Sequence, residues 1–119
     1  MLLLAQIVTG LVLLVHVYIV LLETLLFDSR GRRVFGLTAE KAEIVRPAMS
    51  NQGCYNGFLV AALALGLFHP DAVIADAFSL FGLVCVAVAG LWGAITVKKS
   101  ILFIQTVPAA LALALRQLA

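Results

Sequence analysis

The sequence contains very little charge. Only 12% of its 119 residues are Asp, Glu, Lys or Arg, whereas 64% are hydrophobic, and its mean hydropathy is +1.15. A soluble domain of this length could not bury so much apolar surface, because small domains bury too small a fraction of their chain. The low charge therefore excludes an ordinary soluble domain and predicts that the lipid bilayer is the solvent of this protein.

Cysteine and net positive charge are also scarce. The two cysteines, Cys54 and Cys85, lie in apolar segments without metal-ligand spacing, so we expect buried thiols and neither a disulfide nor a metal site. The net charge is only +2, and the basic residues gather at the ends of apolar runs, which argues against a nucleic-acid partner. No cofactor motif is present, so the sequence assigns no cofactor.

The sequence is rich in long apolar runs. About 20 apolar residues cross a bilayer as a helix, and four runs are long enough, at residues 2–27, 47–68, 72–97 and 100–118. Because three runs follow the first, we expect the first to be a retained span and not a cleaved signal peptide. The short links between runs force antiparallel neighbours. The sequence thus predicts an all-α fold, with a single integral membrane domain over residues 1–119 built as a four-helix up-down bundle.

The basic residues predict the orientation of this bundle. Seven of the eight lie in the first link, residues 28–46, or in the third link at Lys98 and Lys99, and only Arg116 lies on the opposite side. Cytoplasmic links carry the excess of Lys and Arg, so both links are predicted to be cytoplasmic and both termini extracytoplasmic.

The first link is long enough to hold structure of its own. We expect Thr38 to cap a short amphipathic helix at the headgroup level, and Pro47 to open the second span. The arginines of the link have two interpretations, which both stay open. They set the topology and contact anionic lipid, or some of them bind an anionic substrate.

The orientation gathers polar side chains in the cytoplasmic half of the bundle. Span one ends there with Glu23, and His16 lies two turns deeper on nearly the same face. A carboxylate inside a span indicates a functional site, so Glu23 and His16 are the predicted acid–base groups. The predicted ligand-binding residues on the other spans are Asn51, Gln52, Tyr55, Asn56, Trp92, Thr96 and Gln105.

Other interpretations of these polar groups remain open. The amides could hydrogen-bond to one another and fasten the helices together. Glu23 could extend to the interface or pair with Arg30. Two rows of small residues, which include Gly57 and Gly90, predict close approach of helix backbones and not a ligand site.

Several stretches resemble one family. "GRRVFGLT", "NQGCYNGFL" and "WGAITVKKSILFIQTVPA", together with His16 and Glu23, resemble the bacterial membrane proteins called domain of unknown function 1304. The resemblance covers nearly the whole chain and implies a multi-pass, four-helix protein of the bacterial inner membrane, but no activity. The predicted site residues that it places on family motif positions are His16, Glu23, Asn51, Gln52, Tyr55, Asn56 and Gln105.

A weaker similarity is to the membrane-associated eicosanoid and glutathione metabolism family. "RRVFGLT" and "VRPAMSNQGCY" are similar to its basic link and to the start of its second helix, although Cys54 stands where that family has Glu. The similarity implies an oligomer with a small molecule between subunits.

Three functions fit these observations. The first is a membrane enzyme, or a protein that binds a lipophilic or anionic small molecule, with a pocket between helices. The second is a proton-coupled transporter, similar to the small multidrug resistance transporters in length, span count and a Glu in span one. The third is a non-catalytic assembly subunit. Since four short helices leave little room for a pocket inside one subunit, we expect a homo-oligomer.

Overall fold

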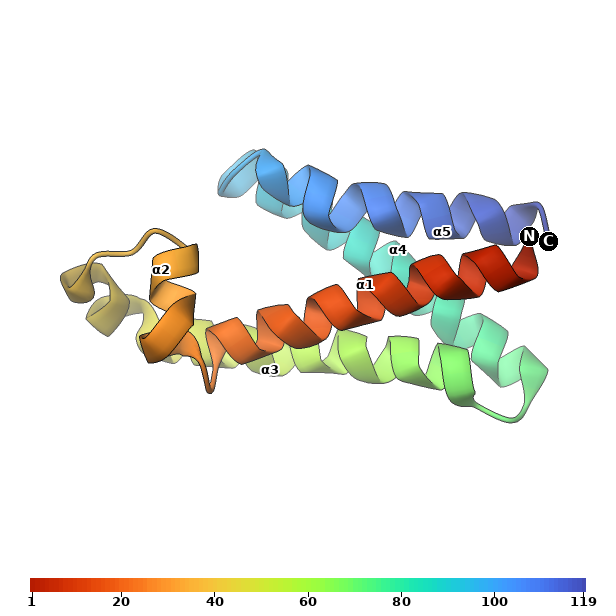
Figure 1. Cartoon of the computed structure of the whole chain (residues 1–119), viewed down its shortest axis with the longest axis horizontal. Helices are drawn as coiled ribbons and strands as arrows, with labels where there is room; N and C mark the ends of the chain where they lie inside the picture. Colours follow the sequence, from red (N-terminus) through yellow and green to blue (C-terminus); the bar gives the residue numbers. More distant parts are fainter. The chain divides into compact units, whose positions relative to one another are not determined.

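The computed structural model describes residues 1–119 and contains helices but no strand, which confirms the predicted all-α class. Figure 1 shows the elements along the chain. They are α1 (Leu2–Glu23), η1 (Phe27–Gly31), α2 (Arg32–Val34), α3 (Ala39–Phe68), α4 (Ala72–Thr96), η2 (Leu102–Thr106) and α5 (Val107–Gln117). Two of them, α1 and α4, are long and apolar enough to cross a membrane, and the apolar helix Leu102–Gln117 is shorter.

The long helices follow the predicted spans unevenly. α4 ends at Thr96, one residue before the predicted end of its span, but α1 ends at Glu23, four residues early. After Glu23 the backbone turns, and the Leu26 amide donates to the Leu21 carbonyl over 2.7 Å. This turn passes directly into η1, a π-helical turn. The apolar run therefore extends past the end of its helix.

The first link differs most from the sequence prediction. The prediction of a separate helix at the headgroup level is wrong. α3 is one helix of 30 residues that begins at Ala39 and contains Pro47 in its interior. Proline lacks the amide that would bond to the carbonyl four residues earlier, and α3 continues past Pro47 without that bond. The expected cap is correct, since the Thr38 hydroxyl accepts a hydrogen bond from the Lys41 amide over 3.2 Å.

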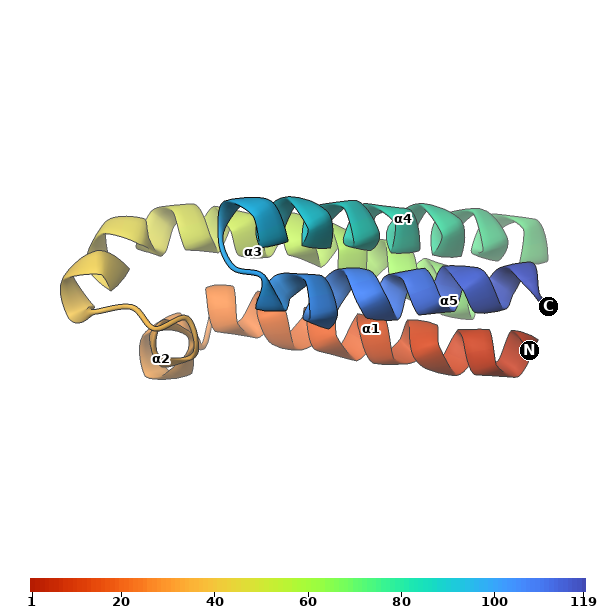
Figure 2. The same ribbon diagram turned by 90° about the horizontal axis from the view of Figure 1, so that it is seen from above.

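The chain packs as two compact units. The terminal unit comprises Met1–Leu14 and Leu59–Ala119, and the central unit comprises Val15–Phe58. Within the terminal unit, α4 and α5 run side by side and both chain termini lie at one end (Figures 1 and 2). Its core is apolar and draws on α1, α3, α4 and α5. The core residues are Ala5, Val8, Val12, Leu63, Leu83, Val86, Ala109, Ala112 and Leu115.

Close helix packing in the terminal unit depends on glycine. A Cβ on Gly66 would lie 2.8 Å from the Ser79 amide nitrogen, and a Cβ on Gly90 would lie 2.7 Å from the Thr106 amide nitrogen. Both positions therefore admit only glycine without a backbone shift. A Cβ on Gly57, by contrast, would meet nothing within 4 Å, so the structure supports only part of the predicted small-residue packing.

Candidate functional site

One partly buried polar contact in the central unit joins α1 to α3. Glu23 is the last residue of α1 and is only 6% exposed. The Asn56 side-chain amide donates to Glu23 Oε1 over 2.6 Å. Two residues 33 positions apart are thus brought together, as expected where one antiparallel helix ends and the next begins. This pair is the centre of the candidate site.

Small residues allow the two helices to meet there. A Cβ on Gly53 would lie 3.2 Å from Glu23 Cβ and 2.5 Å from Thr24 Cγ2. Any larger residue would therefore push α3 away from the carboxylate. Thr24, which the sequence analysis did not single out, also donates its hydroxyl to the Val20 carbonyl over 2.6 Å. The only signal for Thr24 in the sequence is its position directly after Glu23.

His16, the second predicted acid–base group, is fully buried in α1. It lies seven residues before Glu23, which corresponds to about 10 Å along a helix. The two backbone positions are therefore further apart than the roughly 3 Å that a direct hydrogen bond spans. The predicted proton relay between His16 and Glu23 stays a prediction.

The other polar residues at this end of α3 do not reach the carboxylate. Asn51, Gln52 and Tyr55 are exposed, and the Tyr55 ring packs edge-on against Phe58 with a centroid distance of 5.6 Å. Of these four polar side chains, only Asn56 contacts Glu23. Cys54 is exposed as well, so its prediction as a buried thiol is wrong.

Three predicted ligand-binding residues belong to the terminal unit. Trp92 is 69% exposed, and the Thr96 hydroxyl donates to the Trp92 carbonyl of its own helix over 2.7 Å. Gln105 is half-buried in η2. Its neighbour Thr106, which the sequence analysis missed, donates to the Ala87 carbonyl over 2.9 Å and so links η2 to α4. The convergence of Trp92, Thr96 and Gln105 with Glu23 stays a prediction.

Three arginines of the first link, Arg30, Arg33 and Arg46, form side-chain hydrogen bonds. Arg46 Nη2 lies 2.6 Å from Asp28 Oδ1, and Arg46 Nη1 lies 2.7 Å from Glu43 Oε2. These hydrogen bonds, first that to Glu43 and then that to Asp28, raise the pKa of Arg46. Arg30 bonds to Tyr18, so the expected alternative in which Arg30 pairs with Glu23 is wrong.

The arrangement at Glu23 suits hydrogen-bond and proton chemistry. A carboxylate has about four acceptor positions on its two oxygens, and the chain fills one of them, on Oε1. A ligand hydroxyl or amide could therefore bond to the same group. No three His, Cys, Asp or Glu side chains are arranged to hold a metal ion.

Comparison with known proteins gives one family. No curated protein and no solved structure matches the chain, so the similarity to the eicosanoid and glutathione family receives no support. The sequence model of the family described as "Protein of unknown function (DUF1304)" matches residues 10–116. Because this match covers nearly the whole chain, as the "NQGCYNGFL" stretch predicts, the protein belongs to the DUF1304 family.

Proposed function

We propose that this protein crosses the bacterial inner membrane four times and binds a lipophilic small molecule beside Glu23 and Asn56. It acts there as a membrane enzyme or a binding protein. The observation that carries this proposal is the 2.6 Å hydrogen bond from the Asn56 amide to the buried Glu23 carboxyl. A buried carboxyl in a span is costly, and one amide leaves most of its acceptor positions available.

The membrane architecture has independent support. α1 and α4 are long and apolar enough to cross a membrane, and the core of the terminal unit draws on four helices. This fits a four-helix bundle. The basic residues between α1 and α3, and between α4 and α5, favour cytoplasmic links and extracytoplasmic termini.

Glu23 is the acid–base group of this proposal, with His16 as its second member. Asn56 orients the carboxyl, and the exposed Asn51, Gln52 and Tyr55 contribute to the binding of the molecule once a second copy of the chain covers them. The homo-oligomer is thus part of the proposal, because these three side chains face away from the central unit's own interior.

The test is mass spectrometry of small molecules that co-purify with the full chain in mild detergent. Glu23→Gln keeps the shape of the side chain and removes its charge, and Asn56→Leu removes the donor. Glu40→Gln is the matched control, because Glu40 is exposed and forms no ion pair. We expect a molecule that is retained by the wild type and by Glu40→Gln but lost from the two site variants.

Two other outcomes would overturn this assignment. If no molecule is bound by the wild type, the Glu23–Asn56 pair serves only to fasten helices, as in an assembly subunit. If reconstituted vesicles show a flux that requires both Glu23 and a pH gradient, the protein is a proton-coupled transporter.

A further inference from the structure

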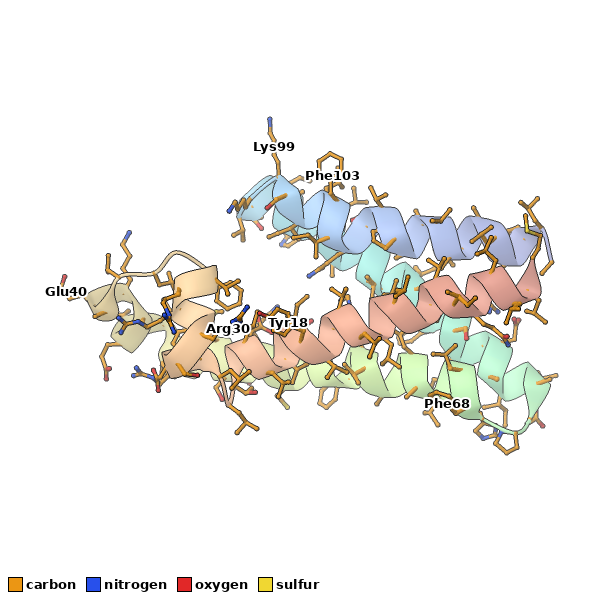
Figure 3. All side chains as sticks on the ribbon, viewed as in Figure 1. Tyr18, Arg30, Glu40, Phe68, Lys99 and Phe103 are labelled. Atoms are coloured by element: carbon orange, nitrogen blue, oxygen red, sulfur yellow. The ribbon has the colours of Figure 1, made fainter.

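Arg30 folds back from the link onto α1. Its Nε donates to the Tyr18 hydroxyl over 2.5 Å, and its guanidinium carbon lies 5.7 Å from the centre of the Tyr18 ring. Figure 3 shows the two side chains next to each other. The contact joins residues 12 positions apart and lies outside the Glu23–Asn56 pair.

This contact places a positive charge beside the apolar part of α1. Tyr18 lies five residues before the end of the helix at Glu23, which corresponds to about 7 Å along the axis. A charged group at apolar depth in a membrane requires a polar or anionic partner. The ion pairs of the structure involve only Arg46 and Arg116 among the basic residues. Arg30 therefore has a neutral phenol but no carboxylate.

The free edge of the guanidinium fits a phosphate. Arginine has five N–H donors, and Tyr18 occupies only the one on Nε. The two Nη groups form a planar fork that binds phosphate oxygens in pairs. Exposed apolar side chains are close to this pair in the sequence: Val17 directly precedes Tyr18, and Leu25, which is 85% exposed, lies five residues before Arg30. A phosphate group joined to hydrocarbon chains would bind both the guanidinium and the exposed apolar side chains.

We propose that Arg30 and Tyr18 form a binding site for the phosphate group of an anionic phospholipid, whose acyl chains lie along the exposed side of α1. The negative headgroup complements an arginine that no carboxylate neutralises. Arg32, which also forms no ion pair, adds positive potential around the headgroup. The apolar flank distinguishes this site from one for a soluble phosphate compound.

The test measures lipid retention on the full chain by native mass spectrometry. The protein is released from detergent micelles that contain equal amounts of phosphatidylglycerol and phosphatidylcholine. The variant is Arg30→Gln, and the matched control is Arg33→Gln, which removes the same charge from an exposed arginine bonded only to the Ser29 carbonyl. We expect the ratio of bound phosphatidylglycerol to phosphatidylcholine to fall about fivefold more in Arg30→Gln than in Arg33→Gln.

Two further variants separate the site from general surface charge. Arg30→Lys keeps the charge but loses the planar fork, and Tyr18→Phe loses the acceptor that orients it, so both should lower the ratio less than Arg30→Gln does. Equal losses in Arg30→Gln and Arg33→Gln, or no preference in the wild type, would overturn the proposal. Displacement of the lipid by millimolar inorganic phosphate would show that free phosphate is sufficient and would overturn the assignment to phospholipid. None of these variants alters Glu23 or Asn56, so this result is independent of the proposed function.

Discussion

The partly buried polar contacts that join helices differ between the two compact units. In the terminal unit, the Thr106 hydroxyl of η2 donates to the Ala87 carbonyl of α4, which is present whatever the neighbouring side chain is, and the side-chain pair Arg116–Asp76 is exposed. In the central unit, Glu23 and Asn56 bond side chain to side chain, so each depends on the identity of the other. We infer that substitutions at Thr106 act independently of neighbouring side chains, whereas substitutions at Glu23 and Asn56 are coupled.

The largest expected effect tests the backbone packing of the terminal unit. Gly90→Ala should lower the free energy of unfolding by about 2–3 kcal/mol, because the new Cβ would lie 2.7 Å from the Thr106 amide nitrogen. Gly57→Ala is the control, since nothing lies within 4 Å of its Cβ position. It should stabilise by up to about 1 kcal/mol through helix propensity. Unfolding in detergent, followed by circular dichroism, measures both. Equal losses in the two variants would contradict the packing described here.

A smaller effect tests the coupling in the central unit. Asn56→Leu should destabilise by about 1–3 kcal/mol, because it leaves the buried Glu23 carboxyl without its donor. Combined with Glu23→Leu, the loss should be smaller than the sum of the two single losses, by about 1 kcal/mol. Thr106→Val removes a hydroxyl of the terminal unit. Combined with Glu23→Leu, it should lower the free energy of unfolding by the sum of the two single losses. Additive losses for Glu23 and Asn56 would remove the distinction between the two units.

The smallest expected effect concerns the exposed Arg46 pairs. Arg46→Gln should accelerate amide hydrogen exchange in η1, Phe27–Gly31, because Arg46 bonds to Asp28 in that turn and its guanidinium lies 5.9 Å from the Phe27 ring centre. Global stability should hardly change, since exposed ion pairs contribute little. Lys41→Gln, at an exposed residue without an ion pair, is the control. Exchange that stays unchanged in Arg46→Gln would show that η1 holds its conformation without this contact.

Sequence patterns were informative where hydrophobicity decides the outcome. They predicted the all-α class, the extent of α4 and the approach of "NQGCYNGFLV" to Glu23, because antiparallel helices joined by a link bring these ends together. The contact is made by Asn56 alone. Asn51, Gln52 and Tyr55 are exposed, although Gln52 lies one turn before Asn56 on nearly the same face. Their order in the sequence could not show which side chain meets α1.

Features that depend on backbone hydrogen bonding could not be predicted from the sequence. Proline suits both the first turn of a helix and, at a cost, its interior, so Pro47 could not show that α3 already begins at Ala39. The π-helical turns η1 and η2 shift hydrogen bonds by one residue, which leaves no hydrophobic signature. The exposure of Cys54 could not be predicted either, because hydrophobicity does not distinguish an exposed apolar position from a buried one.

The turn between α3 and α4 has a consequence for how the hairpin that it closes forms during synthesis. The Asp71 carboxylate accepts hydrogen bonds from the amides of Val73 and Ile74, and the Asp71 amide donates to His69 Nδ1. Every one of these bonds lies within a few residues of sequence, so the turn can close as soon as the ribosome has released it. In the proposed four-span architecture, the α3–α4 hairpin, with its carboxylate already bonded, is suited to insert as a single unit before α5 has been synthesised.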